Sequence, residues 1–172
     1  MLSDKNWHVI SVKENWEKKV AGHLFRKNIE TYVPLNRTKT KNRNGTTAVV
    51  QTPLFPSLIF VHISEEEINI VKQTDGFLHF LYWKSNHAIV SRDDIKTILF
   101  FCGQYENMWV EKWPVLSGQH GDPNLVNGSK KIIYQSGDKS ITSIFLTSIG
   151  YKLAIIDQDQ KIGRLHHQVL PV

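Results

Sequence analysis

The run Thr52–Val61, "TPLFPSLIFV", places two prolines inside one of the most apolar stretches of the chain. Proline lacks the N–H that a sheet ladder needs and fixes φ at roughly −65°, so it is tolerated at the beginning of a strand or at an edge. The residues that follow Pro56 are apolar and predict a buried strand over 57–63. The prolines are therefore expected to hold the turn before that strand in one shape.

Upstream of this strand, the hydrophobic pattern predicts a first strand over 7–12 and then a helix over 13–29. Trp16, Val20 and Leu24 recur at the spacing of a buried helical stripe. At about 100° per residue, a group of basic and imidazole side chains falls on a neighbouring face of the same helix. These side chains are Lys19, His23, Arg26 and Lys27.

The rest of the first 105 residues alternates strand-like and helical segments. Strands are predicted over 30–40, 41–51, 57–63, 77–83 and 87–90, and helices over 64–76 and 91–105. Asn44-Gly45 favours a type I′ hairpin, and Ser64 with Glu67 favours a capping box at the start of a helix that Gly76 would close. Ser91 is a candidate cap for the last helix. The order β-α-β-β-β-α-β-β-α predicts a mixed α/β domain over residues 1–105.

Beyond residue 105 the character of the sequence changes. Residues 106–127 contain prolines, glycines and no sustained period, and are interpreted as a linker whose Trp109 and Trp113 dock on a neighbouring surface. Residues 128–172 hold short β-like runs separated by turns, as in a small barrel. The runs cover 130–134, 140–146, 151–156, 161–165 and 167–172.

Catalytic, metal and cofactor motifs are not found in the sequence. It has no glycine-rich phosphate loop, no HExxH or CxxC pattern and no GxSxG turn, so we expect neither an enzyme nor a bound cofactor. His166 and His167 would point to opposite faces of a strand and would not hold one metal ion. The lone Cys102 is expected to pack as a core residue. It also fits a reducing cytoplasm, and no secretion signal or membrane span is readable.

The positive charge is concentrated near the N-terminus. Residues 1–50 carry ten Lys/Arg and four Asp/Glu, whereas the remainder carries eleven and twelve. This asymmetry favours a polyanion partner such as nucleic acid, although a solubilising surface would give the same count. The same two interpretations stay open for a second basic series, on the expected hairpin. That series is Arg37, Lys39, Lys41 and Arg43.

Taken together, the motifs over roughly residues 6–103 resemble the N-terminal domain of NusG-type transcription elongation factors. They are a Trp-x-Val strand, a Lys-x-x-x-Glu-x-Lys-Val-Ala-x-x-Leu helix, Tyr-x-Pro-Leu, Leu-Phe-Pro-Ser-x-x-Phe-Val and Gly-x-x-x-Phe, in this order. The specialised antiterminators of the RfaH and UpxY type are the most similar branch. The resemblance implies an α+β fold: a NusG N-terminal (NGN) α/β sandwich with a mixed or antiparallel sheet over 1–105, the linker over 106–127, and a divergent KOW-like β-barrel over 128–172.

The resemblance also implies two surfaces. An apolar depression would dock on the clamp helices of the largest RNA polymerase subunit. Its matching positions are Ser11, Tyr32, Leu54, Phe55, Pro56, Phe60 and Trp83. A basic helix face would contact the non-template DNA strand. Its matching positions are Lys13, Lys19, His23, Arg26 and Lys27.

The C-terminal domain would bind a ribosomal protein or a termination factor, and the protein is expected to be a cytoplasmic monomer. Three departures from the pattern are visible. Glu67-Ile68-Asn69 replaces a His-Thr-Thr motif that touches a second polymerase element, Asp75 replaces a basic residue, and the usual KOW core is missing from 128–142. From the resemblance to the specialised branch, the leading hypothesis is an operon-specific antitermination factor of the surface-polysaccharide type. The alternatives are a housekeeping NusG and a nucleic-acid-binding barrel protein that does not act on polymerase.

Overall fold

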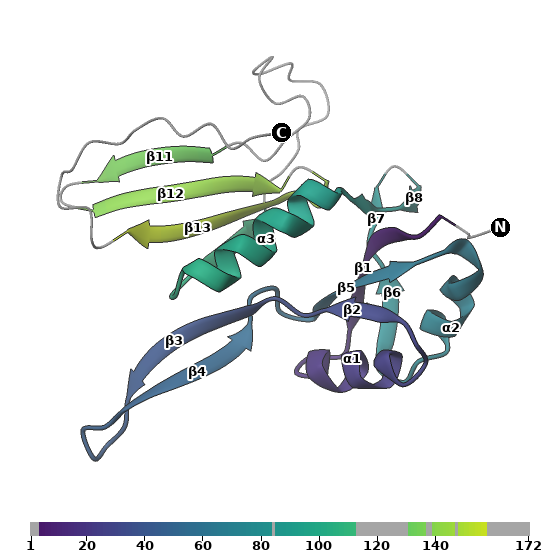
Figure 1. The fold of residues 1–172 in the computed structure, drawn as a ribbon, viewed down its shortest axis with the longest axis horizontal. Helices are drawn as coiled ribbons and strands as arrows, with labels where there is room; N and C mark the ends of the chain where they lie inside the picture. The colour runs from purple at the N-terminus through teal and green to yellow at the C-terminus, as the bar shows by residue number, and fades with distance from the viewer. Residues whose placement is uncertain (1–3, 84, 113–130, 137–138, 147, 158–172) are drawn as a thin grey trace.

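A computed structural model describes residues 4–83, 85–112, 131–136, 139–146 and 148–157 (Figure 1). An N-terminal α/β body lies beside a C-terminal sheet, and a long hairpin projects away from both. Among the described residues, no helix is long and apolar enough to cross a membrane.

The centre of the N-terminal body is an antiparallel sheet of five strands in the order β2-β5-β1-β6, with β9 also paired to β1. Its strands are β1 (Asn6–Val12), β2 (Glu30–Tyr32), β5 (Leu58–Ile63), β6 (Phe77–Phe80) and β9 (Ile89–Val90). The register places Val9 opposite Phe60 at the middle of the sheet. The predicted strands over 7–12 and 57–63 are confirmed as β1 and β5.

The two faces of this sheet are covered by different elements. Helices α1 (Glu17–Phe25) and α2 (Ile68–Lys72) pack on the face that carries Ile10 and Ile59, and the short helix η1 (Glu65–Glu67) leads directly into α2. Because side chains alternate along a strand, Val9 and Phe60 point to the other face. There they meet helix α3 (Arg92–Gln104) and the C-terminal sheet.

The local helix signals were mostly correct. The Ser64–Glu67 capping box is present, and the Ser91 hydroxyl accepts a hydrogen bond from the Asp94 N–H at 3.0 Å at the start of α3. The prediction that Gly76 closes the second helix is wrong, because α2 already ends at Lys72. Gly76 instead has φ +90° just before β6, where a Cβ atom would lie 2.7 Å from Val20. The glycine allows α1 to approach this turn closely.

Strands β3 (Leu35–Lys41) and β4 (Thr47–Pro53) form the projecting hairpin, and β7 (Tyr82–Trp83) and β8 (Asn86–His87) form a small one. The hairpin at Asn44-Gly45 is confirmed, but the predicted type I′ turn is wrong. The Gly45 N–H donates to the Asn42 C=O at 3.0 Å, and within 42–46 only Gly45 has a positive φ, +80°. This is the longer loop in which a turn is followed by a glycine bulge.

The C-terminal sheet is antiparallel, with the order β10-β13-β12-β11. Its strands are β10 (Trp109–Lys112), β11 (Lys131–Ser136), β12 (Lys139–Leu146) and β13 (Tyr151–Asp157). The first residues of the predicted linker are thus a strand, because Trp109–Lys112 pairs with Tyr151–Ala154. The other linker residues from 113 onward and the last two predicted strands lie outside the described residues, so the closure of a barrel remains a prediction.

Candidate functional site

The turn before β5 has the features of a type II turn. The Leu58 N–H donates to the Phe55 C=O at 3.2 Å, which closes the four-residue turn with Pro56 in its second position. Ser57 follows with φ +59°. Proline suits the second position of such a turn, whereas the third position normally takes glycine because it needs a positive φ. A serine in this conformation is strained and must be held by its surroundings.

Three hydrogen bonds to other elements hold this turn. The Glu17 Oε1 atom, on α1, accepts from the Ser57 N–H at 2.7 Å, and the Ser57 C=O accepts from the Val12 N–H at 2.9 Å. The Leu54 N–H donates to the Pro34 C=O at 2.8 Å. The segment "LFPS" is therefore fixed by α1, β1 and the residues before β3, in addition to its prolines.

Replacing Glu17 with alanine is expected to lower the free energy of unfolding by about 1–3 kcal/mol. The change removes a buried carboxylate and leaves the Ser57 N–H without its charged acceptor. Urea denaturation followed by circular dichroism measures the effect. Glu17→Gln keeps an acceptor oxygen and should lose less. Equal losses for the two variants would contradict a hydrogen-bonding role for this carboxylate.

Most of the predicted polymerase-binding residues lie together at this turn. The Phe55 and Phe60 rings meet edge to face with centroids 5.4 Å apart, and the Tyr32 and Phe60 centroids are 6.3 Å apart. We call this surface the docking face. It consists of Ser11, Tyr32, Leu54, Phe55, Pro56 and Phe60. Trp83 belongs to β7, and its side chain lies outside the described residues.

The C-terminal sheet covers much of the docking face. Phe55 is 1% exposed and Phe60 is 0% exposed. The Phe55 ring packs edge to face on Tyr151 of β13, with centroids 5.6 Å apart. The same apolar cluster takes in one side of β12 and β13, namely Ile144, Leu146, Leu153 and Ile155. The family resemblance assigns Phe55 and Phe60 to polymerase binding, but in this arrangement of the chain both rings are buried inside the protein.

A polar contact joins α3 to the C-terminal sheet beside this cluster. The Asp94 carboxylate accepts hydrogen bonds from the Ser148 N–H at 3.2 Å and from the Ser148 hydroxyl. The Ser91 N–H also donates a hydrogen bond to the Ser148 hydroxyl oxygen, at 3.4 Å. Asp94 is buried, so these bonds satisfy a carboxylate that would otherwise be costly to remove from water. The contact pins the turn between β12 and β13 to the start of α3.

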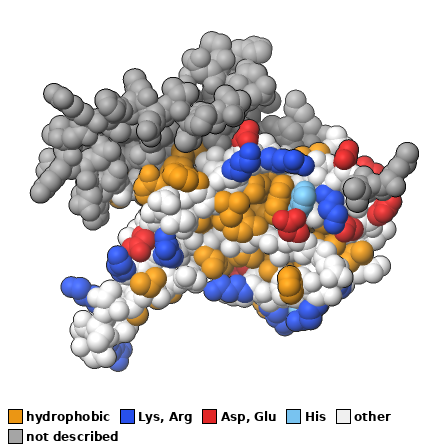
Figure 2. Space-filling view, viewed as in Figure 1, with side chains coloured by type: hydrophobic (Ala, Val, Ile, Leu, Met, Phe, Trp, Pro, Cys, Tyr) orange, Lys and Arg blue, Asp and Glu red, His pale blue; other side chains and the backbone are white. Residues whose placement is uncertain are grey.

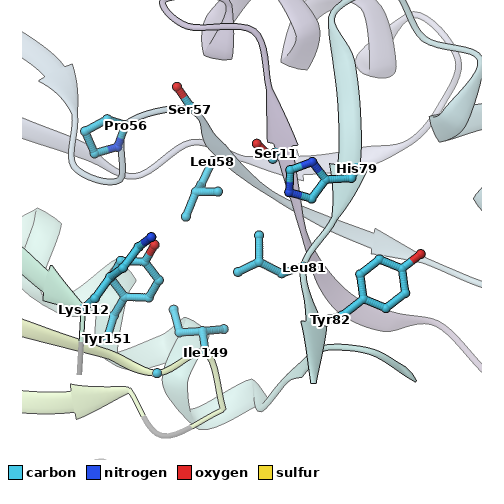
Figure 3. A pocket seen from close by; sticks show the side chains of 11 residues that line it. Ser11, Pro56, Ser57, Leu58, His79, Leu81, Tyr82, Lys112, Ile149 and Tyr151 are labelled. Atoms are coloured by element: carbon cyan, nitrogen blue, oxygen red, sulfur yellow. The ribbon is translucent and has the colours of Figure 1, made fainter. Parts of the chain in front are cut away.

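One part of the docking face borders an open pocket between the two sheets (Figure 3). The cavity has a volume of about 760 Å³. Ser11 and Pro56 line it from the N-terminal side, Lys112 and Tyr151 from the C-terminal side. Figure 3 shows Leu58, Leu81 and Ile149 pointing into it. The C-terminal sheet therefore leaves an edge of the docking face accessible.

Tyr32 and Cys102 form a second contact at the docking face. Burial raises the pKa of the Tyr32 hydroxyl, and the Cys102 thiol beside it raises that pKa further. Burial also raises the pKa of the Cys102 thiol. A thiol that stays protonated is a poor nucleophile. Cys102 packs against the apolar cluster, as predicted.

The predicted DNA-binding residues lie on α1 and at its two ends: Lys13 precedes the helix, and Arg26 and Lys27 follow it. His23, Arg26 and Lys27 line a shallow depression of about 340 Å³ together with Thr74 and Asp75. The Lys27 Nζ atom donates to the Thr74 hydroxyl at 2.9 Å. Sequence reasoning missed Thr74, since only the fold brings the end of α2 beside α1.

Lys13 and Lys19 belong to the same surface but lie around Trp16. Their Nζ atoms are 4.6 Å and 3.5 Å from the centroid of the Trp16 ring, within the range of a cation–π contact. Lys13 also forms an ion pair with Asp75 at 3.6 Å. The structure thus places all five predicted cationic or imidazole side chains along one side of the domain, on or beside α1.

Within the part of the chain that the structure describes, no group of three or more His, Cys, Asp or Glu side chains could hold a metal ion. His166 and His167 lie outside that part. The organised features of the described region are therefore the docking face and the basic side of α1.

Comparisons with known proteins agree with this fold. The sequence profile of the family described as "Transcription termination factor nusG" matches residues 5–99, which is more than half of the 172 residues. Among solved structures, one reported as "Domain interaction in Thermotoga maritima NusG" is similar, with a TM-score of 0.51 and 14% sequence identity. The match covers 88% of this chain and 92% of that one. No curated protein sequence matches. On the profile match, the chain belongs to the NusG family of transcription factors.

Proposed function

We propose that the protein is a transcription elongation and antitermination factor that binds RNA polymerase through the docking face, by contact with the clamp helices of the largest subunit. Members of the family are non-enzymatic transcription factors. The observation that carries the proposal is the cluster of Tyr32, Phe55 and Phe60, held beside a rigid turn at the positions of the family motif. A preformed apolar surface loses little conformational entropy on binding.

In the arrangement described here, most of the docking face is covered, including Phe55 and Phe60, so full contact with the polymerase requires the C-terminal sheet to move away. The contacts that must be released are the packing of Phe55 on Tyr151 and the bonds between Asp94 and Ser148. A chain with a covered and an uncovered state shifts toward the uncovered one when a partner binds that state more tightly. We propose that the C-terminal sheet controls access to polymerase in this way.

The finer parts of the proposal rest on the resemblance of the motifs over residues 6–103 to the specialised branch of the family. That resemblance supports an operon-specific factor of the surface-polysaccharide type. Glu67 and Asp75 depart from the RfaH pattern, so the second polymerase contact and the DNA signal of RfaH are not part of the proposal. The C-terminal domain, once released, would be free to bind a ribosomal protein or a termination factor. The protein would act in the cytoplasm as a monomer.

The basic side of α1 is proposed to contact the non-template strand. Replacing Arg26 and Lys27 with alanine should weaken the binding of a single-stranded DNA oligonucleotide about tenfold or more near 0.1 M salt, and should reduce the salt slope by about 1.4 for two lost phosphate contacts. Fluorescence anisotropy over a salt series measures both quantities. The same variant should bind a reconstituted elongation complex less tightly than the unchanged protein.

The charge-preserving variant Arg26→Lys/Lys27→Arg is the matched control and should retain most of the affinity. An unaltered salt slope in the alanine variant would mean that Arg26 and Lys27 contact only solvent and do not bind DNA phosphates. If the unchanged protein does not bind the elongation complex at all, the proposed function itself is wrong.

A further inference from the structure

The β3–β4 hairpin carries basic side chains that take no part in the contacts proposed for the docking face and for α1. Residues 35–53 contain four Lys/Arg and no Asp/Glu. Every side chain from Lys39 to Thr47 is exposed, and the hairpin projects well beyond the body of the protein (Figures 1 and 2). Figure 2 shows basic side chains spaced along it toward the tip. An isolated two-stranded ribbon is only marginally stable, so what holds this hairpin in place has to be identified.

The strand register sorts the hairpin side chains into two faces. Arg37, Lys39 and Lys41 alternate along β3 and therefore share one face, spaced about 6.8 Å apart. Their cross-strand partners, Gln51, Val49 and Thr47, are uncharged. The row is therefore uniformly positive.

The base of the hairpin is fixed to the rest of the molecule. The Arg37 guanidinium donates to the Gly103 C=O at 3.0 Å, and the Lys39 ammonium pairs with Glu106 at 2.9 Å. Asn36 exchanges two hydrogen bonds with the backbone of Met108, at 2.7 and 3.0 Å. These contacts set the direction of the hairpin and engage the cations nearest the body.

The two outer cations, Lys41 and Arg43, are different. Neither forms an ion pair with any residue that the structure describes. They stand on a hairpin whose base is anchored, so a ligand can approach them without first breaking an internal contact.

The composition of the hairpin favours nucleic acid over protein as the partner. Its neutral polar side chains are threonine, asparagine and glutamine, which contact phosphates and base edges in protein–DNA complexes. Residues 35–53 contain no Tyr, Trp, Phe or Met, which are enriched in protein interfaces, and their two arginines are of a type common in both protein and DNA interfaces. A two-stranded β-ribbon fits the major groove of B-form DNA, whereas the deep, narrow major groove of A-form RNA does not admit side chains.

We propose that the β3–β4 hairpin is a second nucleic-acid-binding element, which lies in a groove of duplex DNA with Lys41 and Arg43 on the phosphate backbone. It is separate from the single-strand contact assigned to α1. The binding needs no polymerase, so it stands or falls independently of the proposed docking.

The test uses the full-length chain and a 20-base-pair DNA duplex in a fluorescence anisotropy titration over a salt series. Lys41→Ala/Arg43→Ala should weaken duplex binding about tenfold or more near 0.1 M salt, and should reduce the salt slope by about 1.8. Lys72→Ala/Lys96→Ala removes the same charge from α2 and α3 and should leave the slope within about 0.5 of the unchanged protein.

Three results would overturn the proposal: no duplex binding by the unchanged protein at 50 mM salt, an equal loss in the two double variants, or a loss confined to single-stranded DNA. Thermal melting should be the same for all three proteins because the changed side chains are exposed. The α1 variant Arg26→Ala/Lys27→Ala serves as the converse control. It should weaken single-strand binding more than duplex binding, which separates a failure of the hairpin assignment from a failure of the α1 assignment.

Discussion

Replacing Phe55 with alanine is expected to lower the free energy of unfolding by about 3–5 kcal/mol and to abolish the capture of RNA polymerase. The ring is 1% exposed and packs on both Phe60 and Tyr151, so its removal leaves a cavity where the two sheets meet. The same ring lies at the centre of the proposed docking face, so its loss also removes the principal apolar contact with the partner.

Urea denaturation gives the stability of the variant, and a pull-down with purified core polymerase gives its binding. Phe25→Ala is the matched control, since that ring is 76% exposed and its removal should change stability by about 0.5 kcal/mol or less. The pull-down is performed at a temperature where circular dichroism shows the Phe55 variant to be folded. Undiminished capture by a folded Phe55→Ala protein would contradict the docking assignment.

Much of the N-terminal domain could be predicted because its signals are local. The apolar, β-branched pattern of β1 and the strand after Pro56 are set by neighbouring residues, as are the Ser64–Glu67 capping box and the Ser91 cap. The helical spacing of Trp16, Val20 and Leu24 likewise identified the buried side of α1. In each case a few residues close in sequence determine the backbone conformation.

The covering of the docking face could not be predicted in this way. Phe55 and Tyr151 are far apart in sequence. The hydrophobic pattern of a sequence is also the same whether an apolar side chain packs on a partner or on its own chain. Strand β10 was missed for a related reason. Four residues in a segment rich in proline and glycine form a strand only because β13 offers them an edge. The sequence also gave no sign that Glu17 would hold the Ser57 turn.

A reversible crosslink across the two sheets should switch polymerase binding off and on. The Asp94 and Ser148 side chains are in contact, so cysteines introduced at both positions are expected to form, on oxidation, a disulfide that fastens α3 to the turn between β12 and β13, and thiol titration checks that it has formed. In the oxidised protein the C-terminal sheet cannot leave the docking face. The remaining thiol, Cys102, is half-buried with a raised pKa, which disfavours its oxidation.

The decisive measurement is the amount of core polymerase captured by the Asp94→Cys/Ser148→Cys protein before and after reduction, with each single-cysteine variant treated identically. We expect capture at background level in the oxidised protein, recovery on reduction, and no redox dependence in the single variants. Equal capture by the oxidised and reduced forms would contradict the claim that polymerase binds the face that the C-terminal sheet covers.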